Sequence, residues 1–300
     1  MLPSSYAVLE AIFAVFTLST HTVTGQSADS FSTCRLTTSS VGEQVVTDAV
    51  SGFKYMWATQ CGYSNTKPSA PSIEVRGTTH VSDAALQKAA RLTHLMVSFM
   101  SPTLYRRVAA NLAVGIYYRR TEDISVFPEY TPTPNCRNIC TGNCSLTCSD
   151  RSLPLAYEIA YGGRLVVVPA QNVECSSTNP NQFENLLVAE FSRSIYKYVL
   201  TDSHKQKVLD ANSDAPSAWG MTIPVIDYFR QASLSWFQST KLNSATTYGM
   251  NTCQGSALCP NEWFTRNNMK QKDSRLYEVL NDIYNNDRAY IHGGINLCDW

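Results

Sequence analysis

The sequence lacks an excess of charge of either sign. Its 300 residues include 24 lysines and arginines against 24 aspartates and glutamates, so the formal net charge is zero at pH 7. A neutral chain produces no long-range field that would gather nucleic acid or an anionic membrane. We therefore expect no nucleic-acid partner, and any binding has to come from local chemistry.

Histidine is also scarce, and no two histidines of the five lie one helical turn apart, as a helical zinc site requires. We interpret those that follow the N-terminal apolar run as structural or surface residues: His80, His94, His204 and His292. The chain has no G-x-S-x-G turn or comparable signature of a nucleophilic hydrolase, and no internal repeat. A hydrophobic share of 44% is, however, ample for a buried core.

The N-terminus has the pattern of an export signal. The apolar run YAVLEAIFAVFTL is followed by the polar STHTVTG, which predicts a signal peptide over residues 1–25 and cleavage after Gly25. No Lys or Arg precedes the run and Glu10 interrupts it, so a membrane anchor is the alternative. The run is shorter than the roughly 20 apolar residues that a span needs, which favours a secreted, extracellular protein without a membrane span after cleavage.

Ten cysteines, an even number, agree with export and predict a disulfide-stapled protein. They are Cys34, Cys61, Cys136, Cys140, Cys144, Cys148, Cys175, Cys253, Cys259 and Cys298. Cys253 and Cys259 flank a short loop that can close locally. The run CRNICTGNCSLTC could instead hold a soft metal, but its Asn, Gly, Thr and Ser residues favour a disulfide-stapled loop. The same run contains Asn143, in the chain's N-x-[ST] sequon, as a candidate glycosylation site.

Periodicity predicts an α+β fold, with a small mixed sheet packed on a buried central helix and a mostly helical C-terminal half. We expect an N-terminal arm of turns and a short helix over residues 26–70, then one domain over residues 71–300. Strands are expected in SIEVRG, AVGIYY and RLVVVPA. Helices are expected in THVSDAALQKAARLTHLMVSFM, capped by Ser82 or Asp83, and in SPTLYRRVAANL, with Pro102 in its first turn. Later helices are expected near residues 182–200, 203–212, 223–239 and 273–286.

The predicted central helix, ENLLVAEFSRSIYKYVL, is apolar on most of its circumference. Its remaining stripe carries Glu190, Arg193 and Lys197. One interpretation is a solvent-facing stripe supported by an i,i+3 ion pair. The other depends on Ala189-Glu190-Phe191-Ser192-Arg193, which stands where a zinc peptidase has His-Glu-x-x-His.

Over roughly residues 50–240 the chain resembles a family of secreted proteins with a zinc-peptidase-like (zincin) fold and an HExxH helix. The matching segments are VSDAALQKAARLTHLM, GIYYRRTEDISVFPEY, FENLLVAEFSRSI and IDYFRQASLSWF. The resemblance implies a zincin-like domain with a cleft beneath its edge strand, expected to be RLVVVPA. It also places Asp227 where the family has a glutamate on its downstream acidic helix.

The departures from this family bear on function. Zinc catalysis needs three protein ligands, a water and a carboxylate base. Ala189 has no donor atom and Arg193 stays protonated, so only Glu190 and Asp227 remain of a vestigial site. We expect the cofactor zinc to be lost and Arg193 to pair with Glu190, Asp227 or both.

The sequence therefore predicts a secreted, catalytically inactive metallopeptidase-like protein. Its expected role is binding or structural in extracellular matrix, mucus or a secretion, with an extracellular protein or glycan as partner. The alternative is an active hydrolase with a non-standard site around Glu190 and Asp227. Arg193 between these carboxylates argues against it, because a neighbouring cation keeps both ionised and leaves no protonated acid.

Overall fold

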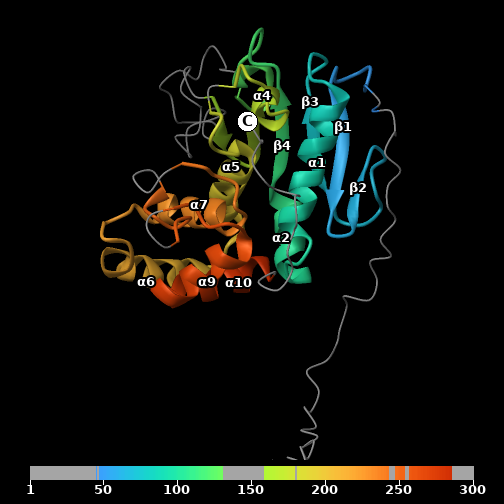
Figure 1. The fold of residues 1–300 in the computed structure, drawn as a ribbon. Coiled ribbons are helices and arrows are strands. Elements are labelled where there is room, and N and C mark those ends of the chain that lie inside the picture. The colour runs from blue at the N-terminus through green and yellow to red at the C-terminus, as the bar shows by residue number, and fades with distance from the viewer. Residues whose placement is uncertain are drawn as a thin grey trace, which may run out of the picture. The chain divides into compact units, whose positions relative to one another are not determined.

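A six-stranded mixed sheet runs through the first half of the domain (Figure 1). The computed structural model describes residues 45, 47–130, 159–179, 181–242, 247–253 and 257–285, all within a compact unit spanning residues 36–300. The sheet order is β2-β1-β3-β4-β6-β5, in which β3, β4 and β6 are parallel and the other pairings are antiparallel. The strands are β1 (Lys54–Thr59), β2 (Gly62–Ser64), β3 (Ile73–Gly77), β4 (Ala113–Tyr117), β5 (Tyr161–Gly162) and β6 (Leu165–Pro169).

Both faces of the sheet centre are buried. Val166 and Val168 of β6 join the main core under the helices, while Leu165 and Val167 join a smaller cluster on the opposite face. The period of two along the strand explains this alternation. Phe127 of the smaller cluster lies so close to β4 that a Cβ on Gly115 would stand 2.8 Å from its ring.

The first two helices begin where their caps predict. In α1 (Asp83–Val97) the Ser82 side chain accepts a hydrogen bond from the Ala85 amide, and in α2 (Pro102–Asn111) Ser101 accepts one from the Leu104 amide. These side chains satisfy amides that lack an intrahelical partner. The sequence predictions for both helices are confirmed.

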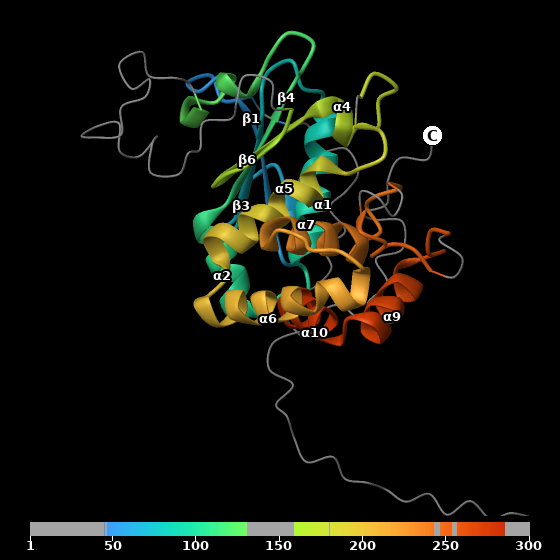
Figure 2. The ribbon, with the colours of Figure 1, turned by 90° about the vertical axis from the view of Figure 1, so that its left-hand side faces the viewer.

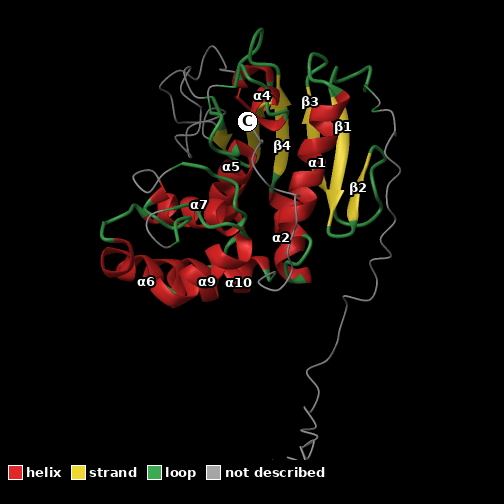
Figure 3. Ribbon diagram, in the orientation of Figure 1, coloured by secondary structure: helices red, strands yellow, loops and turns green. Residues whose placement is uncertain are grey.

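The rest of the described chain is mainly helical (Figure 3). The central helix α5 (Leu186–Ser194) continues directly into a π-helical turn, η5 (Ile195–Val199). It lies over β5 and β6, and α7 (Val225–Trp236) packs on it. The remaining elements are η2 (Ile124–Val126), η3 (Pro128–Tyr130), α4 (Ala170–Val173), α6 (Asp202–Trp219), α9 (Glu262–Lys272) and α10 (Ser274–Tyr284).

Helices α6, α7 and α10 meet at a buried aspartate. The Oδ2 atom of Asp273, at the start of α10, accepts hydrogen bonds from Trp219 Nε1 at 2.9 Å and from the Tyr228 hydroxyl at 2.6 Å. Its Oδ1 atom caps α10 through the Leu276 amide. Asp273 is 3% exposed, so this single carboxylate joins the three helices inside the core.

Three expectations about the fold need correction. Residues 54–64, expected to form an arm of turns and a short helix, are strands of the same sheet as β3. RLVVVPA is not the edge strand, because the short β5 pairs along its outer side. Helix α9 was not predicted, because its buried Glu262 and Arg266 form an ion pair with each other at 3.4 Å and obscure the apolar stripe. The α+β class with a mixed sheet is confirmed.

Candidate functional site

The start of the central helix is fixed by two asparagines. The Asn185 side chain caps α5 by accepting from the amides of Leu187 and Val188. Asn172, just after β6, accepts from the Leu186 amide at 2.9 Å and donates to the Glu184 carbonyl at 2.8 Å. Helix α5 is thereby tied to the end of β6, and its side chains hold a defined position against the sheet.

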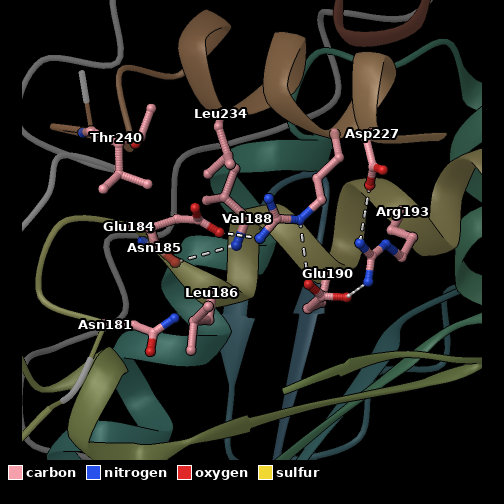
Figure 4. Close-up of polar contacts among 12 residues, drawn as sticks. Asn181, Glu184, Asn185, Leu186, Val188, Glu190, Arg193, Asp227, Leu234 and Thr240 are labelled. Atoms are coloured by element: carbon pink, nitrogen blue, oxygen red, sulfur yellow. Dashed lines mark hydrogen bonds and ion pairs between the residues drawn. The ribbon is translucent and has the colours of Figure 1, made fainter. Parts of the chain in front are cut away.

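Arg193 lies between Glu190 and Asp227 (Figure 4). Its Nη1 atom is 3.1 Å from Glu190 Oε2, and its Nη2 atom is 3.3 Å from Asp227 Oδ1. The predicted ion pairs are therefore both present. The solvent-facing interpretation of this stripe is wrong for Glu190, whose side chain is only 5% exposed.

A second arginine, Arg230, completes the cluster. It lies on α7 one turn after Asp227, with Nε 3.4 Å from Glu190 Oε1 and Nη2 in a short ion pair with Glu184. We call Glu184, Arg230, Glu190, Arg193 and Asp227 the charge network. Arg230 and Glu184 were not predicted from the sequence, although the spacing of Asp227 and Arg230 puts both on one face of α7.

The edge strand closes the network on another side. A Cβ on Gly162 of β5 would stand 2.9 Å from both Glu190 Oε2 and the Glu190 carbonyl oxygen, and 3.2 Å from Arg193 Cβ. Only a residue without a side chain lets β5 approach α5 this closely. Glu190 is thus enclosed by two guanidinium groups and a strand backbone.

The pKa values of Glu184 and Arg230 are both shifted within the charge network. Burial raises the pKa of the Glu184 carboxyl, and the nearby Arg230 opposes that shift in part. Burial works against the charge of Arg230 too, but Glu184 and Glu190 outweigh it and the pKa of its guanidinium is raised. Three carboxylates and two guanidiniums leave a formal charge of −1, so each cation is compensated within the cluster.

The residues at the HExxH position do not fit a zinc ion. Ala189 is fully buried and offers no donor atom. Arg193 directs a permanent cation at the two carboxylates that would otherwise face the metal. Within the described ranges, no group of three or more His, Cys, Asp or Glu side chains is arranged to hold a metal.

The other predicted sites lie partly outside the described residues. Asn143, the Cys136–Cys148 run, Cys34, Cys298, His292 and the signal segment all do. Cys253 and Cys259 form the expected local disulfide, and Cys61 and Cys175 are also disulfide-bonded.

The three described histidines occupy separate places. His80 is exposed and pairs with Glu122 at 2.6 Å, whereas the half-buried His94 hydrogen-bonds the Thr59 carbonyl at 2.7 Å. His204 lies at the start of α6, where its Nδ1 atom is 2.6 Å from the Thr201 hydroxyl. Each has the structural or surface setting that the sequence predicts.

Comparison with protein-family models, curated proteins and solved structures finds nothing that matches this chain. No helix in the described part of the chain is long and apolar enough to cross a membrane. The site must therefore be interpreted from its own geometry.

Proposed function

We propose that this is a secreted protein of zincin-like architecture that has lost its metal and acts by binding, or as a structural component, in an extracellular matrix, mucus or secretion. The observation that carries the proposal is the position of Arg193, bonded to Glu190 on one side and Asp227 on the other. In a zinc site the dication would balance these carboxylates. Here a guanidinium balances them, which accounts for two acids facing each other without a metal.

The same geometry argues against hydrolysis. A general base needs an oxygen within reach of a water that it can deprotonate. Both oxygens of Glu190 are engaged, Oε2 by Arg193 and Oε1 by Arg230, and the Gly162 backbone covers the carboxylate. Asp227 is 42% exposed, but its Oδ1 atom is paired with Arg193.

The first test is zinc content and peptidase activity of the native protein. We expect less than a tenth of a zinc ion per chain by elemental analysis, and no cleavage of a diverse peptide mixture by mass spectrometry. Stoichiometric zinc, or cleavage that is abolished by Glu190→Gln, would contradict the proposal.

The second test rebuilds the ligands. A189H/R193H restores two imidazoles one helical turn apart, while A189Q/R193Q fills similar volume without them. Because Ala189 is fully buried, both variants should lose about 1–3 kcal/mol of stability, so near-UV circular dichroism must first show a native fold. We expect one zinc per chain for the histidine variant and none for the glutamine variant.

Secretion is tested separately. N-terminal sequencing of secreted material should give Gln26 as the first residue.

A further inference from the structure

Four basic residues come from elements that adjoin one another, namely α2, the turn between β5 and β6, η5 and the start of α6. They are Arg107, Arg164, Lys197 and Lys205, and we call them the basic patch. Figure 2 shows α2 beside the end of α5 and the first turns of α6, and α2 and η5 are in direct contact.

Hydrogen bonds and a ring contact link the elements that carry these side chains. Arg164 Nη1 donates to Asn111 Oδ1 at the end of α2, at 2.6 Å, and its guanidinium lies 5.1 Å from the ring centre of Tyr198. Lys205 Nζ donates to the Lys197 carbonyl at 3.2 Å. Burial lowers the pKa of His204, the nearby Asp282 opposes that shift, and Lys207 and Arg107 add to it, so Arg107 of α2 faces the start of α6.

Tyrosine rings hold the cations in place. Besides the contact of Arg164 with Tyr198, the Nζ of Lys197 lies 5.8 Å from the Tyr161 ring centre and that of Lys205 lies 6.0 Å from Tyr196. Cation–π contacts of this kind orient a charged group without neutralising it. Arg164, Lys197 and Lys205 are therefore oriented before an anion binds, which lowers the entropy cost of binding.

Three of the four cations in the basic patch, Arg107, Arg164 and Lys205, differ in this respect from the arginines of the charge network. Among the described residues, none of Arg107, Arg164 and Lys205 has a carboxylate within 4.0 Å, in contrast to Arg193 and Arg230. Asp202, at the start of α6, makes no ion pair with a described residue. Asp282 lies 2.7 Å from Lys207 Nζ and 3.9 Å from His204 Nε2. A local positive surface thus exists on a chain whose net charge is zero.

We propose that the basic patch binds a sulfated glycan. Fixed cations drawn from several elements suit a polymer that carries repeated anionic groups. Single-stranded nucleic acid would also need open aromatic faces for its bases. Here the tyrosines already contact the cations, and Tyr196 is only 8% exposed. The choice of a glycan rests on the extracellular role proposed above, whereas the patch itself does not depend on the lost metal.

The test uses the full secreted protein, with heparin as the probe. The variant R164Q/K205Q removes two cations of the patch, and R119Q/R120Q removes two exposed arginines just after β4, at the opposite end of the sheet. At 50 mM NaCl we expect R164Q/K205Q to weaken heparin binding at least about tenfold and to reduce its salt dependence, with little effect of the control. R164K/K205R should retain binding, because it keeps both charges.

Three results would overturn the inference. They are no binding of heparin by the native protein, equal weakening by both charge-removing variants, and loss of binding in R164K/K205R despite a native near-UV spectrum. Tighter binding to a single-stranded oligonucleotide of matched charge, or equal binding to desulfated heparin, would refute the sulfated glycan as ligand. Zinc content and peptidase activity remain independent readouts, so failure here is distinguishable from failure of the proposed function.

Discussion

Replacing Arg193 by methionine tests the charge network most directly. Methionine keeps an apolar stem in place of the arginine methylenes but removes the cation. The change leaves Glu190 5% exposed with Arg230 as its remaining partner, and leaves Asp227 42% exposed without one. The formal charge of the network falls from −1 to −2.

The two broken ion pairs should contribute very differently. Removing one partner of a buried pair costs about 3–5 kcal/mol, whereas an exposed pair contributes about 0–1 kcal/mol. Arg230 still compensates Glu190, and Arg193 itself is 29% exposed, which screens the interaction. We therefore expect R193M to lower the free energy of unfolding by about 2 kcal/mol, mostly through Glu190.

Double-mutant cycles apportion this loss. In an E190Q background, R193M should cost about 1–2 kcal/mol less than in the native protein, whereas a D227N background should reduce its cost by less than about 0.5 kcal/mol. Urea unfolding with the disulfides intact, followed by fluorescence and far-UV circular dichroism together, supplies the free energies. A coupling with Glu190 near zero, or no larger than that with Asp227, would refute the role given to Arg193.

Three further perturbations address other parts of the molecule. Gly115→Ala should destabilise the protein by about 1–3 kcal/mol because its Cβ would meet the Phe127 ring, and Phe127→Leu in the same chain should recover part of the loss in urea unfolding. Asp273→Ala should lower the free energy of unfolding by about 3–4 kcal/mol, because Trp219, Tyr228 and the first turn of α10 all lose their hydrogen-bond acceptor. The same urea unfolding measures this loss. A loss below about 1 kcal/mol would show that water replaces the carboxylate. Glu184→Gln should flatten the dependence of stability on pH. The raised pKa of Glu184 means that the folded state holds this proton to higher pH than the unfolded state, so native stability should fall as pH rises above about 4.5; parallel curves for the two proteins would contradict this.

Local signals could be predicted from the sequence, and the structure explains why. The caps at Ser82 and Ser101 act over three residues, and the Cys253–Cys259 loop closes over a short separation. One long-range contact was also predicted, the ion pair of Arg193 with Asp227, from a resemblance that itself stays a prediction.

The missed features all depend on tertiary contacts. Strand β1 sits in a stretch rich in turn residues and becomes a strand through its pairing with β3. Arg230 resembles any surface arginine until α7 packs on α5 and brings it to Glu190 and Glu184. The π-helical turn over Ile195–Val199 was not predicted, but Lys197 still lies toward β5, with its Nζ 5.8 Å from the Tyr161 ring centre.

That π-helical turn lies between the part of the chain that carries Glu190 and Arg193 and the part that carries Lys205. The side chains of Glu190 and Arg193 are oriented by α5, before Ile195. The side chains of Lys197 and Lys205 are oriented by η5 and by α6, after it. A π turn holds one residue more than an α turn, and each residue of a helix advances its side chains by about 100°. Deleting one residue between Ile195 and Val199 would therefore rotate the start of α6 relative to α5 and separate Lys205 from the Arg164 side, while Glu190 and Arg193 kept their places. The protein should therefore be more sensitive to a change in the length of this segment than to a change in its composition.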